Sequence, residues 1–234
     1  MKPAPNHSLI LSAETPQYFP ALDYFYKAAQ AGVFVLADEL QFSKHATINR
    51  CRIKTANGAQ WLTVPVRTKG RFGQKIIDVE IDEGNDWRQK HWQCLTINYC
   101  RAAYFEKYAE ALEGFFQRKW KNLADLNFVL TEWLCRILQI NCRLMRGSEL
   151  PAHTRGSERL RAWVAALGGN IYLCDTSERE LLESKKLENT GIEVRSLEFM
   201  PVPYHQQFGE FMPHLSILDL ILNEGDESRR ILQG

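Results

Sequence analysis

The residues best suited to chemistry lie between two apolar runs in the first third of the chain. The segment from Asp38 to Lys54 mixes carboxylates, amides, hydroxyls and cations, and it follows the apolar run 32–37. Open α/β sheets bind ligands where polar groups gather at strand ends. Asp38 comes directly after the apolar run and can hold a ribose or sugar hydroxyl, or act as a base. Its alternative role is a helix cap or an ion-pair partner of Arg50 or Arg52.

Cations and amides in the same segment suit a nucleotide diphosphate. A guanidinium matches phosphate oxygens through two N–H groups, and a lysine ammonium offers a point charge. The alternative is a solvated basic loop that binds nothing. We predict that this segment contributes five ligand-binding residues, namely Gln41, Lys44, Asn49, Arg50 and Lys54.

A histidine supplies the candidate proton carrier. His91 follows Lys90 on a helix predicted to begin at Trp87, after the capping residue Asp86. An imidazole with a pKa of about 6.5 suits proton transfer at physiological pH. Positions 91, 95 and 99 share one helix face, so His91 and Tyr99 can point the same way. We predict Asp38, His91 and Tyr99 as catalytic residues; the alternative for His91 is a packed core histidine.

Two later helix starts can bind an anion through their free backbone N–H groups. Ser157 and Ser177 mark them and are predicted ligand-binding residues, with simple capping as the alternative. The sequence contains no Walker A loop, GxGxxG, GxSxG elbow or HExxH. A P-loop, a standard dinucleotide site and a serine hydrolase are therefore disfavoured, and no metal site is predicted.

Hydrophobic patterning predicts an α/β scaffold for these residues. A strand over 9–11, a proline-bounded loop, a helix from about Pro20 and a strand ending at Leu36 form a βαβ unit. The stretches 171–173 and 191–194 predict further strands, and three helices fill about 87–140. The fold class is thus α/β, a mostly parallel Rossmann-like sheet with flanking helices and a helical middle segment.

Other segments carry more local predictions. The apolar run 61–66 predicts a buried strand after a turn at 55–58, and 76–81 predicts a strand with one wet face. Leucines recur every four residues from Leu126 to Leu138, which indicates the core face of a helix. A closing helix is predicted over 216–222, followed by a frayed tail after Gly225.

The predicted organisation has three parts. Residues 1–146 form an α/β N-terminal part that includes the helical segment, and 147–156 are linker-like. Residues 157–234 form a C-terminal α/β part, packed on the same sheet or as a small lobe. A chain of 234 residues is long enough for one large domain or two small ones.

Composition describes an ordinary globular chain. The formal net charge is +1, so no bulk attraction to nucleic acid or to an anionic membrane is expected. Six cysteines without a CxxC pattern indicate reduced thiols rather than a zinc site. The first residues lack a signal-peptide layout, and no apolar run approaches the ~18 residues of a membrane span. We expect a cytoplasmic protein without nucleic-acid partners or membrane insertion.

Several short motifs occur along the chain in a recognisable combination. They are Pro16-Gln17-Tyr18-Phe19-Pro20, Gln41-Phe42-Ser43-Lys44, Asn49-Arg50, Trp61-Leu62-Thr63-Val64-Pro65-Val66, Lys90-His91 and Leu215-Ser216-Ile217-Leu218-Asp219-Leu220. Together these motifs resemble one known family, the WbqC-like proteins, which are often encoded in bacterial O-antigen and other surface-polysaccharide gene clusters. The resemblance covers nearly the whole chain. One departure is that Glu14 and Thr15 stand where the family usually has His-Gln, and another is that 174–176 replace a Ser-Gly-Pro turn.

The resemblance implies surface-glycan biosynthesis on a nucleotide-sugar or glycan intermediate. We expect acyl or aminoacyl transfer to the amine of a nucleotide-linked amino sugar, with an acyl-CoA or an activated amino acid as donor. Gln17 and Tyr18, in the first motif, and Lys90, in the Lys90-His91 motif, join the predicted ligand-binding set. Two alternatives remain open. One is a non-catalytic protein that binds a glycan intermediate or a partner enzyme, and the other is nucleotidyl transfer on a Rossmann-like fold.

Overall fold

The computed structural model describes residues 9–151, 156–181 and 191–233. The chain forms two compact units, and each is assembled from separate stretches of sequence. Unit 1 comprises Met1–Glu14, Tyr26–Ala37 and Ile140–Met200, while unit 2 comprises Thr15–Phe25, Asp38–Gln139 and Pro201–Gly234. The linker-like role of 147–156 and the three-part organisation stay predictions.

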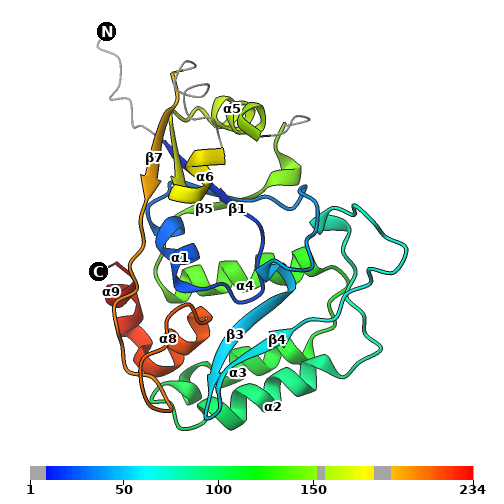
Figure 1. The fold of residues 1–234 in the computed structure, drawn as a ribbon, viewed down its shortest axis with the longest axis vertical. Helices are drawn as coiled ribbons and strands as arrows, with labels where there is room; N and C mark the ends of the chain where they lie inside the picture. Colours follow the sequence, from blue (N-terminus) through cyan, green and yellow to red (C-terminus); the bar gives the residue numbers. More distant parts are fainter. Residues whose placement is uncertain (1–8, 152–155, 182–190, 234) are drawn as a thin grey trace. The chain divides into compact units, whose positions relative to one another are not determined.

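Unit 1 contains a five-stranded parallel sheet with the order β5-β2-β1-β6-β7 (Figure 1). The strands read as apolar runs because a parallel strand is covered on both faces. All four residues of β2 are buried, for example. The strands are β1 (Ile10–Glu14), β2 (Val33–Leu36), β5 (Arg143–Arg146), β6 (Ile171–Asp175) and β7 (Glu193–Leu197).

Helices flank this sheet, and the predicted α/β class with a mostly parallel sheet is confirmed. The chain enters at β1 in the middle of the sheet and adds β2 and β5 on one side. It then returns to add β6 and β7 on the other side. The order of the sheet therefore reverses between β1 and β6, where open α/β sheets place their ligand crevice. The helices of this part of the chain are α1 (Leu22–Ala29), α5 (Gly156–Leu167) and α6 (Thr176–Leu181).

Unit 2 contains the predicted helical middle segment. Its leucine stripe is buried as predicted, with Leu126, Leu130 and Leu134 at most 2% exposed. Two further helices follow late in the chain. The helices are α2 (Trp87–Tyr99), α3 (Phe105–Gln117), α4 (Leu123–Ile137), α8 (Ile217–Glu224) and α9 (Ser228–Gln233).

A β-hairpin replaces the predicted buried strand at 61–66. The strand β3 (Arg50–Thr55) pairs antiparallel with β4 (Gly58–Thr63), and the turn between them uses Gly58 at φ 99°. Most of β4 is exposed, including 45% of Trp61. A strand is therefore present at the start of this run, but the prediction that it is buried was wrong, because an adjacent turn closes the run into a separate two-stranded sheet.

Two further local predictions were wrong. Residues Ile76–Asp78 form a 3₁₀ turn rather than a strand, since the amides of Asp78 and Val79 bond the carbonyls three residues earlier, at Lys75 and Ile76. The tail after Gly225 is helical rather than frayed. In α9 the side chain of Leu232 is only 1% exposed, so its burial stabilises the last turns.

Candidate functional site

A hollow of about 310 Å³ opens in unit 2 beside the predicted catalytic histidine. This volume lies at the small end of the range for ligand pockets, which suits a single ring better than a whole nucleotide. The lining comes from three places: the strand β4 with Pro65 just after it, Asn85 before helix α2, and the first eight residues of α2. It consists of Gln60, Trp61, Leu62, Thr63, Pro65, Asn85, Trp87, Lys90, His91 and Cys94.

The polar lining of the hollow is rich in hydrogen-bond donors. Lys90 carries an ammonium, and Gln60 and Asn85 offer amides. The indole N–H of Trp87 is buried and has no hydrogen-bond partner among the described residues. That N–H is itself shielded from solvent, so the donors that a ligand in the hollow can reach are those of Lys90, Gln60 and Asn85. No carboxylate is present in the lining of this hollow, as far as the described residues show.

Helix geometry brings His91 to the floor of the hollow. Trp87, His91, Leu95 and Tyr99 are spaced four apart and form the buried face of α2. The Tyr18 hydroxyl lies 2.9 Å from Nδ1 of His91, and the imidazole also hydrogen-bonds the backbone of Thr63. Burial lowers the pKa of His91 to about 4, against the raising effect of that backbone bond. The imidazole is therefore neutral at pH 7, and both of its nitrogens have protein partners.

The loop that carries Tyr18 is fixed by a buried amide. Asn127, in the middle of α4, donates from Nδ2 to the carbonyls of Pro16 and Ile48, at 3.0 and 2.7 Å. Phe19 adopts a left-handed conformation with φ 42°, which is uncommon for a bulky residue. It is 1% exposed and packs edge-on to the Tyr18 ring at 4.7 Å. A strained backbone of this kind persists only where the surrounding packing fixes it. The packing around Phe19 therefore fixes the loop that places the Tyr18 hydroxyl beside His91.

Trp61 forms an aromatic wall of the hollow with cations above it. The Arg50 guanidinium lies 4.5 Å from the centre of the indole ring and Arg52 lies 5.8 Å away. Such cation–π contacts stabilise a guanidinium at an exposed position. Arg50 also donates to the carbonyl of His45. An exposed tryptophan held in this way offers a flat surface beside positive charge.

The structure separates Tyr99 from His91 along the same helix. Eight residues of α-helix span about 12 Å. The Tyr99 hydroxyl donates to Asp219 at 2.8 Å and accepts from the backbone N–H of Lys54 at 2.9 Å. Tyr204 donates to the other oxygen of Asp219, also at 2.8 Å. The Lys54 ammonium bonds Gln206 at 3.0 Å, so predicted residues Tyr99 and Lys54 belong to a second, buried network.

The remaining predicted residues fall into three groups. Asp38 and Asn49 are buried, and the Asn49 amide donates to the carbonyl of Val64 at 2.8 Å. Gln17 accepts from the Thr47 hydroxyl, also at 2.8 Å. Gln41 and Lys44 are exposed, and neither lines the hollow. Ser157 lies in the first turn of α5 in unit 1, and the side chain of Ser177 is outside the described residues.

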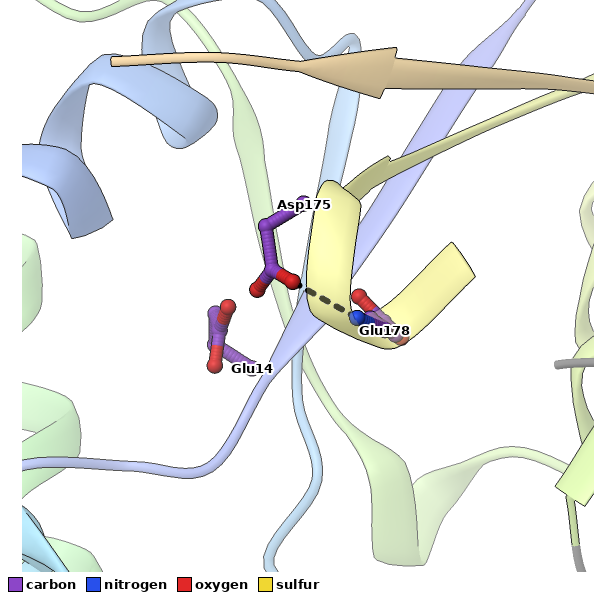
Figure 2. A group of neighbouring side chains, drawn as sticks. All are labelled: Glu14, Asp175 and Glu178. Carbon is purple, nitrogen blue, oxygen red and sulfur yellow. Dashed lines mark hydrogen bonds between the residues drawn. The ribbon is translucent and has the colours of Figure 1, made fainter. Parts of the chain in front are cut away.

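Unit 1 has its own group of titratable side chains at the point where the sheet order reverses. Glu14 ends β1, Asp175 ends β6 and Glu178 lies in α6, and Figure 2 shows the three carboxylates turned toward one another. Asp175 accepts from the backbone N–H of Glu178 at 2.7 Å and so caps the first turn of α6. One oxygen of each carboxylate lies within 4.8 Å of the others, the spacing of a metal site.

A lysine ammonium already serves as the cation of this group. Lys27 Nζ lies 2.8 Å from Glu14 and 2.9 Å from Glu178. Burial would lower the pKa of Lys27, but the two carboxylates outweigh it and raise that pKa. Burial raises the pKa of Glu14. Tyr172 donates to the second oxygen of Glu178 at 2.6 Å. The group is therefore a closed ion-pair network that fits an ammonium better than a divalent metal.

Comparisons with known proteins now identify the family. The model of the WbqC-like protein family matches residues 15–231. The chain belongs to the WbqC-like protein family. One relative is "Uncharacterized protein Rv1507c" of Mycobacterium tuberculosis (strain ATCC 25618 / H37Rv), which is 35% identical over 213 residues. That match covers 90% of this chain and 92% of the relative. No solved structure matches this WbqC-like chain.

Sequence reasoning missed several residues that this WbqC-like structure groups together. The strand that carries Trp61 was predicted to be buried, although the adjacent turn signal at 55–58 indicated a hairpin with an exposed face. Lys27 carried no signal, because it sits on an ordinary amphipathic helix. The positions Glu14 and Asp175, where the chain departs from the family pattern, meet in one cluster although 161 residues separate them.

Proposed function

We propose that this WbqC-like protein acts on a nucleotide-linked amino sugar of bacterial surface-glycan biosynthesis, and that the hollow beside His91 holds the sugar. The reaction would transfer an acyl or aminoacyl group to the sugar amine. The observation that carries the proposal is the donor-rich lining of the hollow, which offers the Lys90 ammonium and the amides of Gln60 and Asn85. A nucleotide-sugar supplies acceptors for such donors through its hydroxyls and diphosphate.

Charge and shape support the same ligand class. Lys90 lies in the lining, and Arg50 and Arg52 lie over the outer wall at Trp61. Guanidinium and ammonium groups bind phosphate oxygens. The indole face of Trp61 suits one face of a sugar ring, while the amides of Gln60 and Asn85 suit its hydroxyls. The small volume would admit the sugar alone, and the nucleotide would lie outside the hollow near Arg50 and Arg52.

His91 would take the proton from the attacking amine in the transfer reaction. A new N–C bond forms between the sugar amine and the acyl carbon. The C–S bond of an acyl-CoA, or the C–O bond of an aminoacyl adenylate, breaks at the same carbon, so that CoA thiolate or AMP leaves. The proton lost from the amine must reach a base. The neutral imidazole is the candidate base in this hollow, once its hydrogen bond from Tyr18 is exchanged for one to substrate.

A second function is favoured by the state of that imidazole. Both of its nitrogens are engaged, and burial holds its pKa near 4, well below the value of an effective base at pH 7. The same hollow would then bind a glycan intermediate without transferring a group. In this case Tyr18 and His91 stabilise the loop around the binding site and take no part in a reaction.

Product analysis distinguishes the two functions. The protein is incubated with UDP-glucosamine and either acetyl-CoA or an aminoacyl adenylate, and the sugar is analysed by mass spectrometry. A mass increase that disappears in His91→Asn, while UDP-glucosamine binding persists, supports transfer. Binding without a change in mass supports the second function. Lys90→Ala should weaken the binding of UDP-glucosamine, because it removes the ammonium from the lining. Lys119→Ala changes an exposed lysine outside the hollow and is its matched control.

A further inference from the structure

The net charge of +1 conceals a strong segregation of charge along the chain. From Leu40 to Ile77 the sequence has eight Lys or Arg residues and no Asp or Glu. The rest of the chain therefore carries a formal net charge of −7. The expectation of no attraction to an anionic surface was drawn from the net charge of the whole chain, and this acid-free segment of unit 2 is a local excess of positive charge that the net value hides.

Within this segment, residues 67–75 form a clasped basic loop. The Gln74 amide donates to the carbonyl of Arg67 at 3.2 Å and closes the neck of the loop. Arg67 and Arg71 both reach the same oxygen of Glu80, at 3.3 and 3.1 Å. A turn follows in which the Arg71 N–H bonds the Thr68 carbonyl at 3.1 Å. Gly70, at φ 72°, supplies the positive φ that a type II turn needs at this position.

The clasped loop presents one bare aromatic ring. Phe72 is 97% exposed, the highest value among the large apolar side chains of the described residues. Gly73 follows it with φ 70°, and a side chain added there would meet nothing within 4 Å. A single exposed apolar residue is ordinary by itself. This ring, however, sits at the tip of a braced loop next to Lys69 and Lys75, which are exposed and make no ion pair among the described residues.

We propose that the clasped loop docks this protein on an anionic lipid bilayer. Phe72 would enter the boundary between headgroups and acyl chains, and Lys69, Arg71 and Lys75 would contact the anionic headgroups. Anionic leaflets attract basic segments within about one Debye length, and an apolar anchor adds to that attraction. None of the helices in the described ranges combines the length and apolar character needed to cross a bilayer, so this contact is peripheral.

The layout favours lipid over nucleic acid. Proteins that bind single strands combine a basic groove with several open aromatic faces for base stacking. The clasped loop has one exposed ring, Phe72, with basic residues close to it in the sequence at positions 69, 71 and 75. Trp61 is also exposed within the acid-free segment, but it lines the hollow beside His91 and lies outside the clasped loop. Binding of a single-stranded oligonucleotide to the clasped loop is thus the alternative to lipid binding, and the experiment includes it.

Vesicle co-sedimentation of the full chain tests the proposal. Vesicles of phosphatidylcholine with 30% phosphatidylglycerol should bind the protein, and vesicles of phosphatidylcholine alone should bind it far less. Phe72→Ser should weaken binding about tenfold, from the apolar area lost. Lys69→Ala and Lys75→Ala should each weaken it about fivefold, from the attraction per basic residue. Binding should fall steeply in 0.5 M salt.

Matched variants make the result decisive. Ile97→Ser removes a side chain that is 75% exposed on α2, outside the acid-free segment, and should leave vesicle binding unchanged. Lys119→Ala removes an exposed lysine on another part of the same unit and should also have no effect. Equal binding of the wild type and Phe72→Ser overturns the proposal. The proposal is also overturned if the anionic vesicles bind no protein while a uridine oligonucleotide binds the wild type and not Phe72→Ser.

Discussion

Acidification from pH 7 to pH 4 should reveal the buried imidazole of His91. In an unfolded chain this side chain takes up a proton at a pKa of about 6.5, whereas burial in the folded protein lowers the pKa to about 4. Between these values the unfolded state binds more protons than the folded state. Stability therefore rises with pH across this window, and the contribution of His91 is lost as the pH falls from 6.5 to 4.

The size of this loss follows from the two pKa values. Each unit of pKa difference corresponds to about 1.4 kcal/mol, so a shift from 6.5 to about 4 gives a loss of about 3 kcal/mol by pH 4. Other groups also titrate over this range, so a non-titrating variant is needed as the reference. His91→Asn can still accept the hydrogen bond from Tyr18 and carries no ionisable group.

Urea unfolding of the wild type and His91→Asn at several pH values measures the effect. The wild type should lose about 3 kcal/mol more than the variant between pH 7 and pH 4. Proton NMR of the imidazole gives the pKa directly, and the His91 resonance should stay unchanged until the pH approaches 4. An imidazole that titrates near 6.5, or a stability difference that does not vary with pH, would refute the buried environment of His91.

Three further outcomes test the packing of each unit. Lys27→Met should lower the free energy of unfolding by about 3 kcal/mol, because two carboxylates lose their buried cation, while the same change at the exposed Lys107 should cost little. Leu130→Ala should cost about 2–5 kcal/mol, since this side chain is fully buried in α4. Tyr99→Phe should cost about 1–3 kcal/mol, because it removes the hydrogen bond to the buried Asp219. Urea or thermal unfolding measures all three, and changes within 0.5 kcal/mol of zero would contradict the contacts assigned here.

The main sheet and the middle helices follow from local patterns in the sequence. β2 and β6 are short apolar runs because both of their faces are covered, and α4 has leucines every four residues because one face meets the core. These patterns are set by burial alone, so each can be recognised within a single segment. The α/β class and the helical middle segment could therefore be predicted correctly.

The hairpin was harder to predict because apolar content does not distinguish a buried strand from an exposed one. Trp61 and Leu62 are both apolar, yet the first is 45% exposed and the second 3%. What decides their environment is the pairing of β4 with β3 through the turn at Gly58. A strand that pairs only with its neighbour in a hairpin keeps one face toward solvent.

The clusters of interacting side chains could not be predicted from the sequence, for a different reason. Lys27 meets Glu178 across 151 positions, and Tyr99 meets Asp219 across 120. No periodicity relates residues so far apart, and topology alone brings them together. The predicted catalytic set Asp38, His91 and Tyr99 stays a prediction, although Tyr99 and His91 have separate partners in this structure.

Calorimetric titration with UDP-glucosamine tests the central claim most directly, namely that the hollow beside His91 binds a nucleotide-linked sugar. The wild type should bind, and Trp61→Ala should bind at least tenfold more weakly, because it removes the aromatic wall. Lys119→Ala should bind like the wild type. A wild type that takes up no ligand, or equal affinity in Trp61→Ala, would contradict the assignment of this hollow as the sugar site.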